Sequence, residues 1–225
     1  MNSYSQEQLF QDIEQHCRVL LSKRTKPLRV AVNGIEGTGK TTFAQRLSEH
    51  LNNQSIETHH ISIDGFHFDS SIRYRQGRDS AQGYYEDSYD ELGFVEKVLI
   101  ASQQLSPQLT RATHDLKTDE YIHLEPESIN SNSIIMTDGA YLFKPNYLPH
   151  WDLKIYLHCS FEVAMDRGAM RDEQSLGGIE EAKAKFINRY HAASKIYIQQ
   201  NNPEQQADII IDNSNFKQLK LIKGL

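Results

Sequence analysis

The sequence predicts a three-layer α/β fold with a five-stranded parallel sheet between helices, and three observations favour it. Five short apolar or β-branched runs have the character of strands. Helical patterns separate several of them, and strands that alternate with helices pair in parallel through right-handed crossovers. The length of 225 residues is enough for one core and too short for two ordinary domains with a linker. We therefore expect a single domain over residues 1–225.

The expected elements follow the chain in order. The first is a helix over residues 6–22, because its apolar residues recur at helical spacing and Ser5 and Gln8 can form a capping box. The strands are expected over residues 28–33, 57–63, 133–137, 153–157 and 208–211. Further helices are expected from Thr41 onward and over residues 88–104, 161–171 and 178–200.

Composition narrows the class of function. The formal net charge of −6 is the reverse of what a nucleic-acid-binding surface needs, so no nucleic-acid partner is expected. No apolar run approaches the ~20 residues that span a bilayer, which predicts no membrane association. The N-terminus lacks the features of a signal peptide, and Cys17 and Cys159 are the only cysteines, so we expect a cytoplasmic protein. The sequence leaves open whether copies of the chain form a homo-oligomer.

Residues 34–41, GIEGTGKT, match the phosphate-binding pattern G-x-x-x-x-G-K-[ST] at every fixed position. Glycines let backbone N–H groups curl around an anion, and the positive end of the following helix points at it. Lys40 is expected to reach the β- and γ-phosphates of a nucleoside triphosphate, and the Thr41 hydroxyl to ligate Mg²⁺. The nucleotide-binding residues that the motif predicts are Gly34, Glu36, Gly37, Thr38, Gly39, Lys40, Thr41 and Thr42.

Two acids follow predicted strands. Three of the strands end in Gly34, Asp64 and Asp138, and ligands of parallel sheets bind beyond the carboxyl ends of the strands, so these residues should converge. Asp64 could accept the proton of an attacking hydroxyl or hold a water of Mg²⁺. Asp138 stands where a Walker-B acid belongs. For both acids a turn formed with the following glycine is the alternative.

Basic residues provide further candidates. Arg167 and Arg171 lie one helical turn apart, so they can present one face to a transferring phosphoryl group and neutralise its charge. Ion pairs with neighbouring acids are the alternative. Arg189 is another cationic candidate. The segment 73–90 combines arginines, tyrosines and acids, which suits a surface that binds a polar, ring-bearing substrate, with a solvated loop as the alternative.

These motifs together resemble those of a known family. The phosphate loop, the sequence Asp-Gly-Phe-His at 64–67, the segment 73–90, Thr-Asp-Gly at 137–139 and residues 208–213 are similar to those of bacterial uridine kinase-like proteins. These proteins belong to the uridine kinase/phosphoribulokinase branch of the P-loop kinases. The resemblance spans residues 28–213 and implies a nucleoside kinase-like P-loop fold with a helical lid near residues 161–190. It also implies ATP- and Mg²⁺-dependent phosphorylation of a small acceptor, with the 5′-hydroxyl of uridine or cytidine as the first candidate.

The resemblance implies roles for individual residues. Asp64 matches the acid that is taken as the base for the nucleoside 5′-hydroxyl, and Asp138 stands where uridine kinases have an acid near the metal. Asp87 falls in the region that supplies a ribose-binding carboxylate. The catalytic group expected from motif and resemblance is Asp64, Lys40, Arg167 and Arg171, and the metal-binding group is Thr41, Asp64 and Asp138.

Two segments depart from the family pattern. Residues 114–119 resemble a substrate segment that reads Tyr-Asp-Phe-x-x-His in uridine kinases, but His114 and Asp119 replace the Tyr and His that contact the base. The lid arginines are four residues apart rather than three. Phosphoryl transfer is therefore expected, whereas the acceptor could instead be a pantothenate-like alcohol or a sugar phosphate, and an ATP-binding regulatory protein is a further alternative. The predicted substrate residues are Tyr84, Tyr85, Asp87, His114, Asp119 and Arg189.

Overall fold

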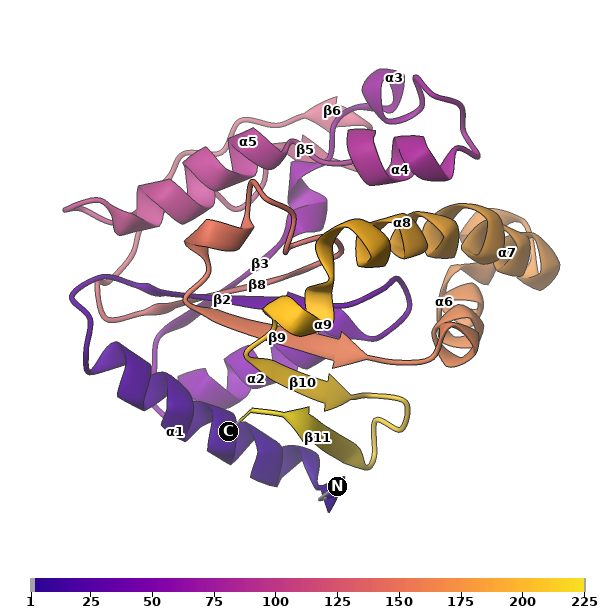
Figure 1. Cartoon of the computed structure of the whole chain (residues 1–225). Helices are drawn as coiled ribbons and strands as arrows, with labels where there is room; N and C mark the ends of the chain where they lie inside the picture. The colour runs from indigo at the N-terminus through magenta and orange to yellow at the C-terminus, as the bar shows by residue number, and fades with distance from the viewer. Residues whose placement is uncertain (1–2, 225) are drawn as a thin grey trace.

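A central sheet with helices on both faces organises residues 3–224, which the computed structural model describes (Figure 1). Five strands of this sheet run parallel, in the spatial order β10-β9-β2-β8-β3. They are β2 (Leu28–Asn33), β3 (Thr58–Ser62), β8 (Ile134–Gly139), β9 (Leu153–His158) and β10 (Ile209–Asp212). They coincide with the five strands expected from the sequence, so the α/β class and the parallel sheet are confirmed.

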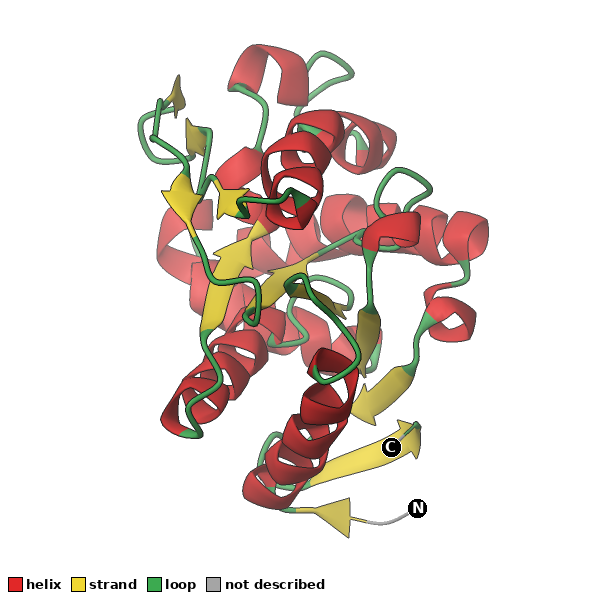
Figure 2. Cartoon of the chain, turned by 90° about the vertical axis from the view of Figure 1, so that its left-hand side faces the viewer, coloured by secondary structure: helices red, strands yellow, loops and turns green. Residues whose placement is uncertain are grey.

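Two antiparallel strands extend the sheet beyond β10, and the sequence prediction missed both. β11 (Leu219–Lys223) pairs with β10, and β1 (Ser3–Tyr4) pairs with β11. The two ends of the described chain therefore lie at the same edge of the sheet (Figures 1 and 2). Within residues 3–224 the sheet has seven strands rather than five.

Helices pack on each face because alternate residues of the strands point to opposite sides. One core lies between the sheet and the helices α1 (Gln6–Leu21) and α2 (Lys40–Asn53), where Val30 and Val32 are buried. The other core contains Ala31 and lies against α4 (Ala81–Asp87) and α8 (Ala192–Asn201). The predicted capping box at Ser5 and Gln8 begins α1.

The remaining helices fall largely where the sequence predicted them. The helix expected over 88–104 consists of α5 (Glu91–Phe94), a π-helical segment η2 (Val95–Ile100) and η3 (Ala101–Gln103). The predicted lid region, residues 161–190, forms α6 (Phe161–Leu176), α7 (Ile179–Lys185) and most of a second π-helical segment, η5 (Phe186–His191), which continues into α8. No helix in the described part of the chain is long and apolar enough to cross a membrane.

Short elements complete the chain. They are the single turns η1 (Ile63–Phe66), α3 (Ser70–Arg73), η4 (Leu148–His150) and α9 (Pro203–Gln206), and two small antiparallel pairs, β4 (Gln108–Leu109) with β7 (Glu127–Ser128) and β5 (His114–Asp115) with β6 (Glu120–Tyr121).

A buried tyrosine joins α8 to the carboxyl end of β2. The hydroxyl of Tyr197 accepts a hydrogen bond from Asn33 Nδ2 at 2.6 Å and another from the backbone N–H of Phe143 at 3.1 Å. Tyr197 is almost fully buried, so both donors would lack a partner without this hydroxyl. Because Asn33 is the last residue of β2, the contact fixes the point at which the chain leaves the sheet.

We predict that Tyr197→Phe lowers the free energy of unfolding by about 2–4 kcal/mol, because it leaves two buried donors unsatisfied. Chemical denaturation measures this difference. Tyr156→Phe is the matched control, since the Tyr156 hydroxyl makes no hydrogen bond to the described residues, and should change stability by less than about 0.5 kcal/mol. Equal losses in the two variants would contradict the role of the Tyr197 hydroxyl.

Candidate active site

The loop between β2 and α2 has the conformation that its glycines predict. Gly37 and Gly39 adopt positive φ angles of 87° and 86°, a region that residues with a side chain rarely occupy. A Cβ atom on Gly37 would also lie 2.0 Å from the carbonyl oxygen of Ala164. No side chain caps the start of α2 at Gly39, so the first N–H groups of this helix are available to an anion.

A cavity of about 430 Å³, here called the nucleotide cavity, opens over this loop. The loop, the ends of the strands and α6 contribute its lining residues, which are Glu36, Gly37, Gly39, Lys40, Thr41, Thr42, Asp64, Asp138, Gly139, Ala140, Arg167, Gly168 and Arg171. Two residues of the predicted nucleotide-binding group, Gly34 and Thr38, lie beneath the loop instead. A Cβ atom on Gly34 would lie 2.7 Å from the carbonyl oxygen of Leu157, and the Thr38 hydroxyl donates to the carbonyl oxygen of Ile35.

Lys40 folds back along the loop. Its Nζ atom donates to the carbonyl oxygen of Ile35 at 3.0 Å and lies 3.8 Å from Glu36 Oε2. The side chain is nearly buried. A lysine ammonium has three N–H donors, so hydrogen-bonding capacity remains for an anion in the cavity.

Thr41 and Asp138 form the pair that could hold a metal ion. The Thr41 hydroxyl donates to Asp138 Oδ2 at 2.6 Å, and His60 Nε2 lies 2.7 Å from Asp138 Oδ1. Hydroxyl and carboxylate oxygens are suitable ligands for Mg²⁺, which usually keeps several waters and takes other ligands from a bound phosphate. The residues present therefore fit a nucleotide-bound Mg²⁺. The described residues contain no cluster of three or more His, Cys, Asp or Glu that could hold a metal ion alone.

Sequence reasoning missed His60, because its partner is set by the register of β3 against β8. The two strands pair in parallel with His60 opposite Met136, so the His60 side chain reaches along the sheet to Asp138. His59, the preceding residue, points to the other face and contacts Glu57 Oε1 at 2.8 Å.

We predict that His60→Leu raises the Mg²⁺ concentration needed for half-maximal binding of an ATP analogue by about 10- to 100-fold, because the variant no longer orients Asp138. Titration of Mg²⁺ at fixed analogue concentration measures this. His59→Leu is the matched control and should leave the titration unchanged. A His60→Leu curve that overlays the wild-type curve would contradict the positioning role.

Asp64 lies directly after β3, at the start of η1, and its largely exposed carboxylate faces the cavity. Tyr89 donates a hydrogen bond to Oδ1 at 3.2 Å, and His67 Nε2 lies 3.5 Å from the same oxygen. Desolvation by the surrounding walls acts to raise the pKa of Asp64, but His67, the charge of Lys40 and the Tyr89 hydroxyl outweigh it and lower the pKa below its usual 3.8. The carboxylate is therefore ionised at neutral pH and can accept a proton.

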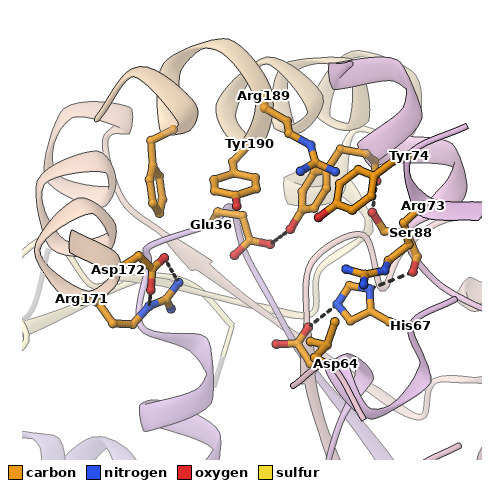
Figure 3. Close-up of a pocket in the computed structure, with 13 residues that line it drawn as sticks. Glu36, Asp64, His67, Arg73, Tyr74, Ser88, Arg171, Asp172, Arg189 and Tyr190 are labelled. Carbon is orange, nitrogen blue, oxygen red and sulfur yellow. Dashed lines mark hydrogen bonds and ion pairs between the residues drawn. The ribbon is translucent and has the colours of Figure 1, made fainter. Parts of the chain in front are cut away.

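A second cavity of about 240 Å³, here called the acceptor cavity, adjoins the first (Figure 3). Both cavities are lined by Glu36, Asp64 and Arg171. The other lining residues of the acceptor cavity are His67, Arg73, Tyr74, Tyr84, Ser88, Leu116, Asp172, Phe186, Arg189 and Tyr190. The carboxylates of Glu36 and Asp64 can thus each contact a molecule in either cavity.

The two arginines of α6 have different partners. Arg167 lines the nucleotide cavity and donates to the carbonyl oxygens of Asn213 and Ser214 at 2.8 and 2.7 Å. Arg171 lines both cavities, and its guanidinium forms a two-pronged ion pair with Asp172 at 2.7 and 2.8 Å. The ion pair that the sequence left open as an alternative is therefore present for Arg171.

Of the six predicted substrate residues, Tyr84 and Arg189 line the acceptor cavity and the other four do not. The Tyr85 hydroxyl accepts a hydrogen bond from Asn201, and its ring lies beneath the Lys144 ammonium. Buried Asp87 accepts hydrogen bonds from Arg75 and Gln76. Neither Tyr85 nor Asp87 is among the residues that line the acceptor cavity, so their roles toward a substrate stay predictions.

His114 and Asp119 are also absent from the lining of the acceptor cavity. His114 is buried in β5, and Asp119 forms an ion pair with Arg73 at 2.6 Å and accepts from the backbone N–H of Ser70. Asp119 therefore contacts the cavity indirectly, through its ion pair with Arg73, which lines the cavity.

The sequence did not single out Tyr74, His67 or Tyr190 as residues that line the acceptor cavity, because only the packing of 63–90 against η5 brings them together.

The parallel sheet and the phosphate-binding loop between β2 and α2 define a P-loop protein. Residues 30–220 match the model of the phosphoribulokinase/uridine kinase family, and the chain belongs to this family.

Curated relatives and solved structures agree with this assignment. The chain is 24% identical over 164 residues to the uridine kinase of Latilactobacillus sakei, covering 70% of this chain and 72% of the relative. It is 22% identical over 206 residues to the uridine kinase of Limosilactobacillus reuteri, covering 89% and 90%. Among solved structures, a possible uridine kinase from Bacillus stearothermophilus superposes with a TM-score of 0.67 at 24% identity, covering 90% of this chain and 98% of that one. D-glycerate 3-kinase from Cryptococcus neoformans superposes with a TM-score of 0.58 at 13% identity, covering 95% and 97%. At these identities the solved structures show a shared fold.

Proposed function

We propose that this protein is an ATP- and Mg²⁺-dependent phosphotransferase that transfers the γ-phosphoryl group of ATP to a hydroxyl group of a small acceptor. The observation that supports it best is the position of Asp64, which lines the nucleotide cavity and the acceptor cavity at once. Phosphoryl transfer requires a donor and an acceptor held in line, with charge stabilisation around the transferring group. The arrangement of the two cavities suits this requirement.

The nucleotide side supplies positive charge. The N–H groups at the start of α2 and the Lys40 ammonium would bind the phosphates, and Arg167 and Arg171 border the same space. Thr41 and Asp138 would hold Mg²⁺, which when bound neutralises charge on the β- and γ-phosphate oxygens.

The acceptor side supplies the base. The acceptor hydroxyl oxygen forms a bond to the γ-phosphorus, while the bond from that phosphorus to the β–γ bridging oxygen breaks and ADP leaves. The proton of the hydroxyl passes to the Asp64 carboxylate, whose lowered pKa keeps it ionised before the reaction.

Two kinds of acceptor are candidates. Uridine and cytidine come first because curated relatives are named uridine kinases, and the tyrosine rings of the acceptor cavity suit a ring-bearing molecule. A small alcohol with a negative group, such as a pantothenate-like compound or a sugar phosphate, is favoured by Arg189 in the same cavity. Because either reaction consumes ATP, we expect the protein to act in the cytoplasm.

We predict that Asp64→Asn lowers kcat by about 10²- to 10⁴-fold, which is the usual contribution of a positioned general base, while the Kd for an ATP analogue changes by less than about threefold. Acceptor-dependent ADP formation and calorimetric titration measure the two quantities. Asp79→Asn, an exposed acid outside both cavities, is the matched control and should keep wild-type turnover.

Near-wild-type turnover of Asp64→Asn would remove the base from the mechanism. A wild-type protein that binds the analogue but forms no ADP with any small hydroxyl acceptor would instead indicate an ATP-binding regulatory protein.

A further inference from the structure

Arg189 brings a positive charge to the acceptor cavity with no carboxylate beside it. Its side chain lines the cavity and is only 4% exposed. Within residues 3–224 its Nε atom has no hydrogen-bond partner. A buried charge without a partner is strongly unfavourable, so folded proteins normally supply one.

Aromatic rings hold the Arg189 guanidinium without neutralising it. The guanidinium carbon lies 4.8 Å from the centroid of the Tyr84 ring, 4.9 Å from that of Tyr74 and 5.8 Å from that of Tyr190. Such rings attract the cation through their π faces, while the N–H donors at the edge of the guanidinium plane stay available for a planar anion. Arg189 and Tyr190 both lie in the π-helical segment η5, a kind of distortion that is frequent at functional sites.

The other arginines of the cavity already have acidic partners. Arg73 forms an ion pair with Asp119 at 2.6 Å, and Arg171 forms one with Asp172 at 2.7 Å. Among the described residues that line the acceptor cavity, Arg189 is thus the arginine without an acidic partner. A neutral ribose or pyrimidine would leave its charge unpaired, whereas a carboxylate or phosphate would pair with it.

The acids of the cavity bind other groups. Glu36 accepts a hydrogen bond from the Tyr84 hydroxyl at 3.1 Å and lies 3.8 Å from the Lys40 ammonium. Asp64 contacts Tyr89 and His67. Neither carboxylate is therefore a partner for Arg189.

Arg189 and Asp64 enter the cavity from opposite sides, Arg189 from the helical segment above and Asp64 from the end of β3 below (Figure 3). In a cavity of about 240 Å³, a small molecule whose hydroxyl approaches Asp64 would direct its far end toward Arg189.

We propose that Arg189 forms an anion subsite in the acceptor cavity, and that the acceptor is a small alcohol with a carboxylate or phosphate group at the end remote from the reacting hydroxyl. The inference rests on the proposed phosphotransfer and specifies its substrate class. Carboxylate and phosphate share the chemistry that a guanidinium recognises, so the experiment below distinguishes them.

Binding of simple anions tests the subsite directly. With the nucleotide cavity filled by a non-hydrolysable ATP analogue and Mg²⁺, we expect saturable binding of methyl phosphate or acetate to the wild-type protein. Arg189→Met should weaken this binding by about tenfold or more, and Arg189→Lys, which keeps the charge but not the planar fork, by less. Arg46→Met, on the exposed side of α2, is the matched control and should bind as the wild type does. Tighter binding of methyl phosphate indicates a phosphorylated acceptor, and tighter binding of acetate indicates a hydroxy acid.

Activity measurements separate this inference from the proposed function. With D-glycerate and ribose 5-phosphate as anionic acceptors and uridine and cytidine as neutral ones, we expect kcat/KM to be at least about tenfold higher for an anionic acceptor, with this advantage lost in Arg189→Met mainly through KM. A preference for uridine or cytidine that Arg189→Met does not alter would overturn the anion subsite and leave the kinase intact.

Failure of the kinase would look different. Anion binding that is lost in Arg189→Met, without ADP formation from any acceptor, would retain the subsite and remove the proposed transfer. Absence of anion binding to the wild type, or equal binding to Arg189→Met, would overturn the subsite whatever the activity.

Discussion

The parallel pairing of β8 with β2 on one side and β3 on the other is the constraint on which the site depends. The register places Asp138 of β8 between Val32 and Ser62, so the three strands end together. The phosphate loop begins directly after β2, and Asp64 follows two residues after Ser62. Since a shift of one residue would turn Asp138 to the opposite face of the sheet, the register of β8 against both neighbours fixes the position of the acid. The hydrogen bond between Thr41 and Asp138 then connects the start of α2 to this strand.

Separate groups of charges border the two cavities, as the proposed phosphoryl transfer requires. Lys40 and the free N–H groups of α2 border the nucleotide cavity, whereas Arg189 lies on the far side of the acceptor cavity. Glu36, Asp64 and Arg171 line both, so two carboxylates and one cation lie where donor and acceptor would meet. Little covalent chemistry is required of the protein in phosphoryl transfer, so the placement of these charges is the main contribution it can make.

Much of this arrangement could be predicted from the sequence, because it depends on local patterns. The loop residues and the acids Asp64 and Asp138 follow directly from motif spacing and from the rule that parallel strands end at one edge. The edge strand β11 was missed although its sequence, LKLIK, begins with alternating apolar and basic residues, and Leu219 is indeed buried while Lys220 is exposed. The partner of His60 could not be predicted, because it depends on the β3–β8 register.

The acceptor side was harder to predict for a physical reason. Polar residues close together in the sequence form hydrogen bonds with one another, as Arg75 and Gln76 do with Asp87. Composition alone therefore did not say which polar side chains would remain available to bind a ligand. Arg189 is buried without such a partner, a property that only the packing of η5 against Tyr74 and Tyr84 reveals.

A crystal structure with a non-hydrolysable ATP analogue and Mg²⁺ tests the central claim most directly. In that complex, Lys40 Nζ should have left the carbonyl oxygen of Ile35 for a phosphate oxygen, and the γ-phosphate should lie where the two cavities meet, beside Asp64. A nucleotide bound elsewhere, with Lys40 still on Ile35, or a γ-phosphate directed away from Asp64, would contradict the account.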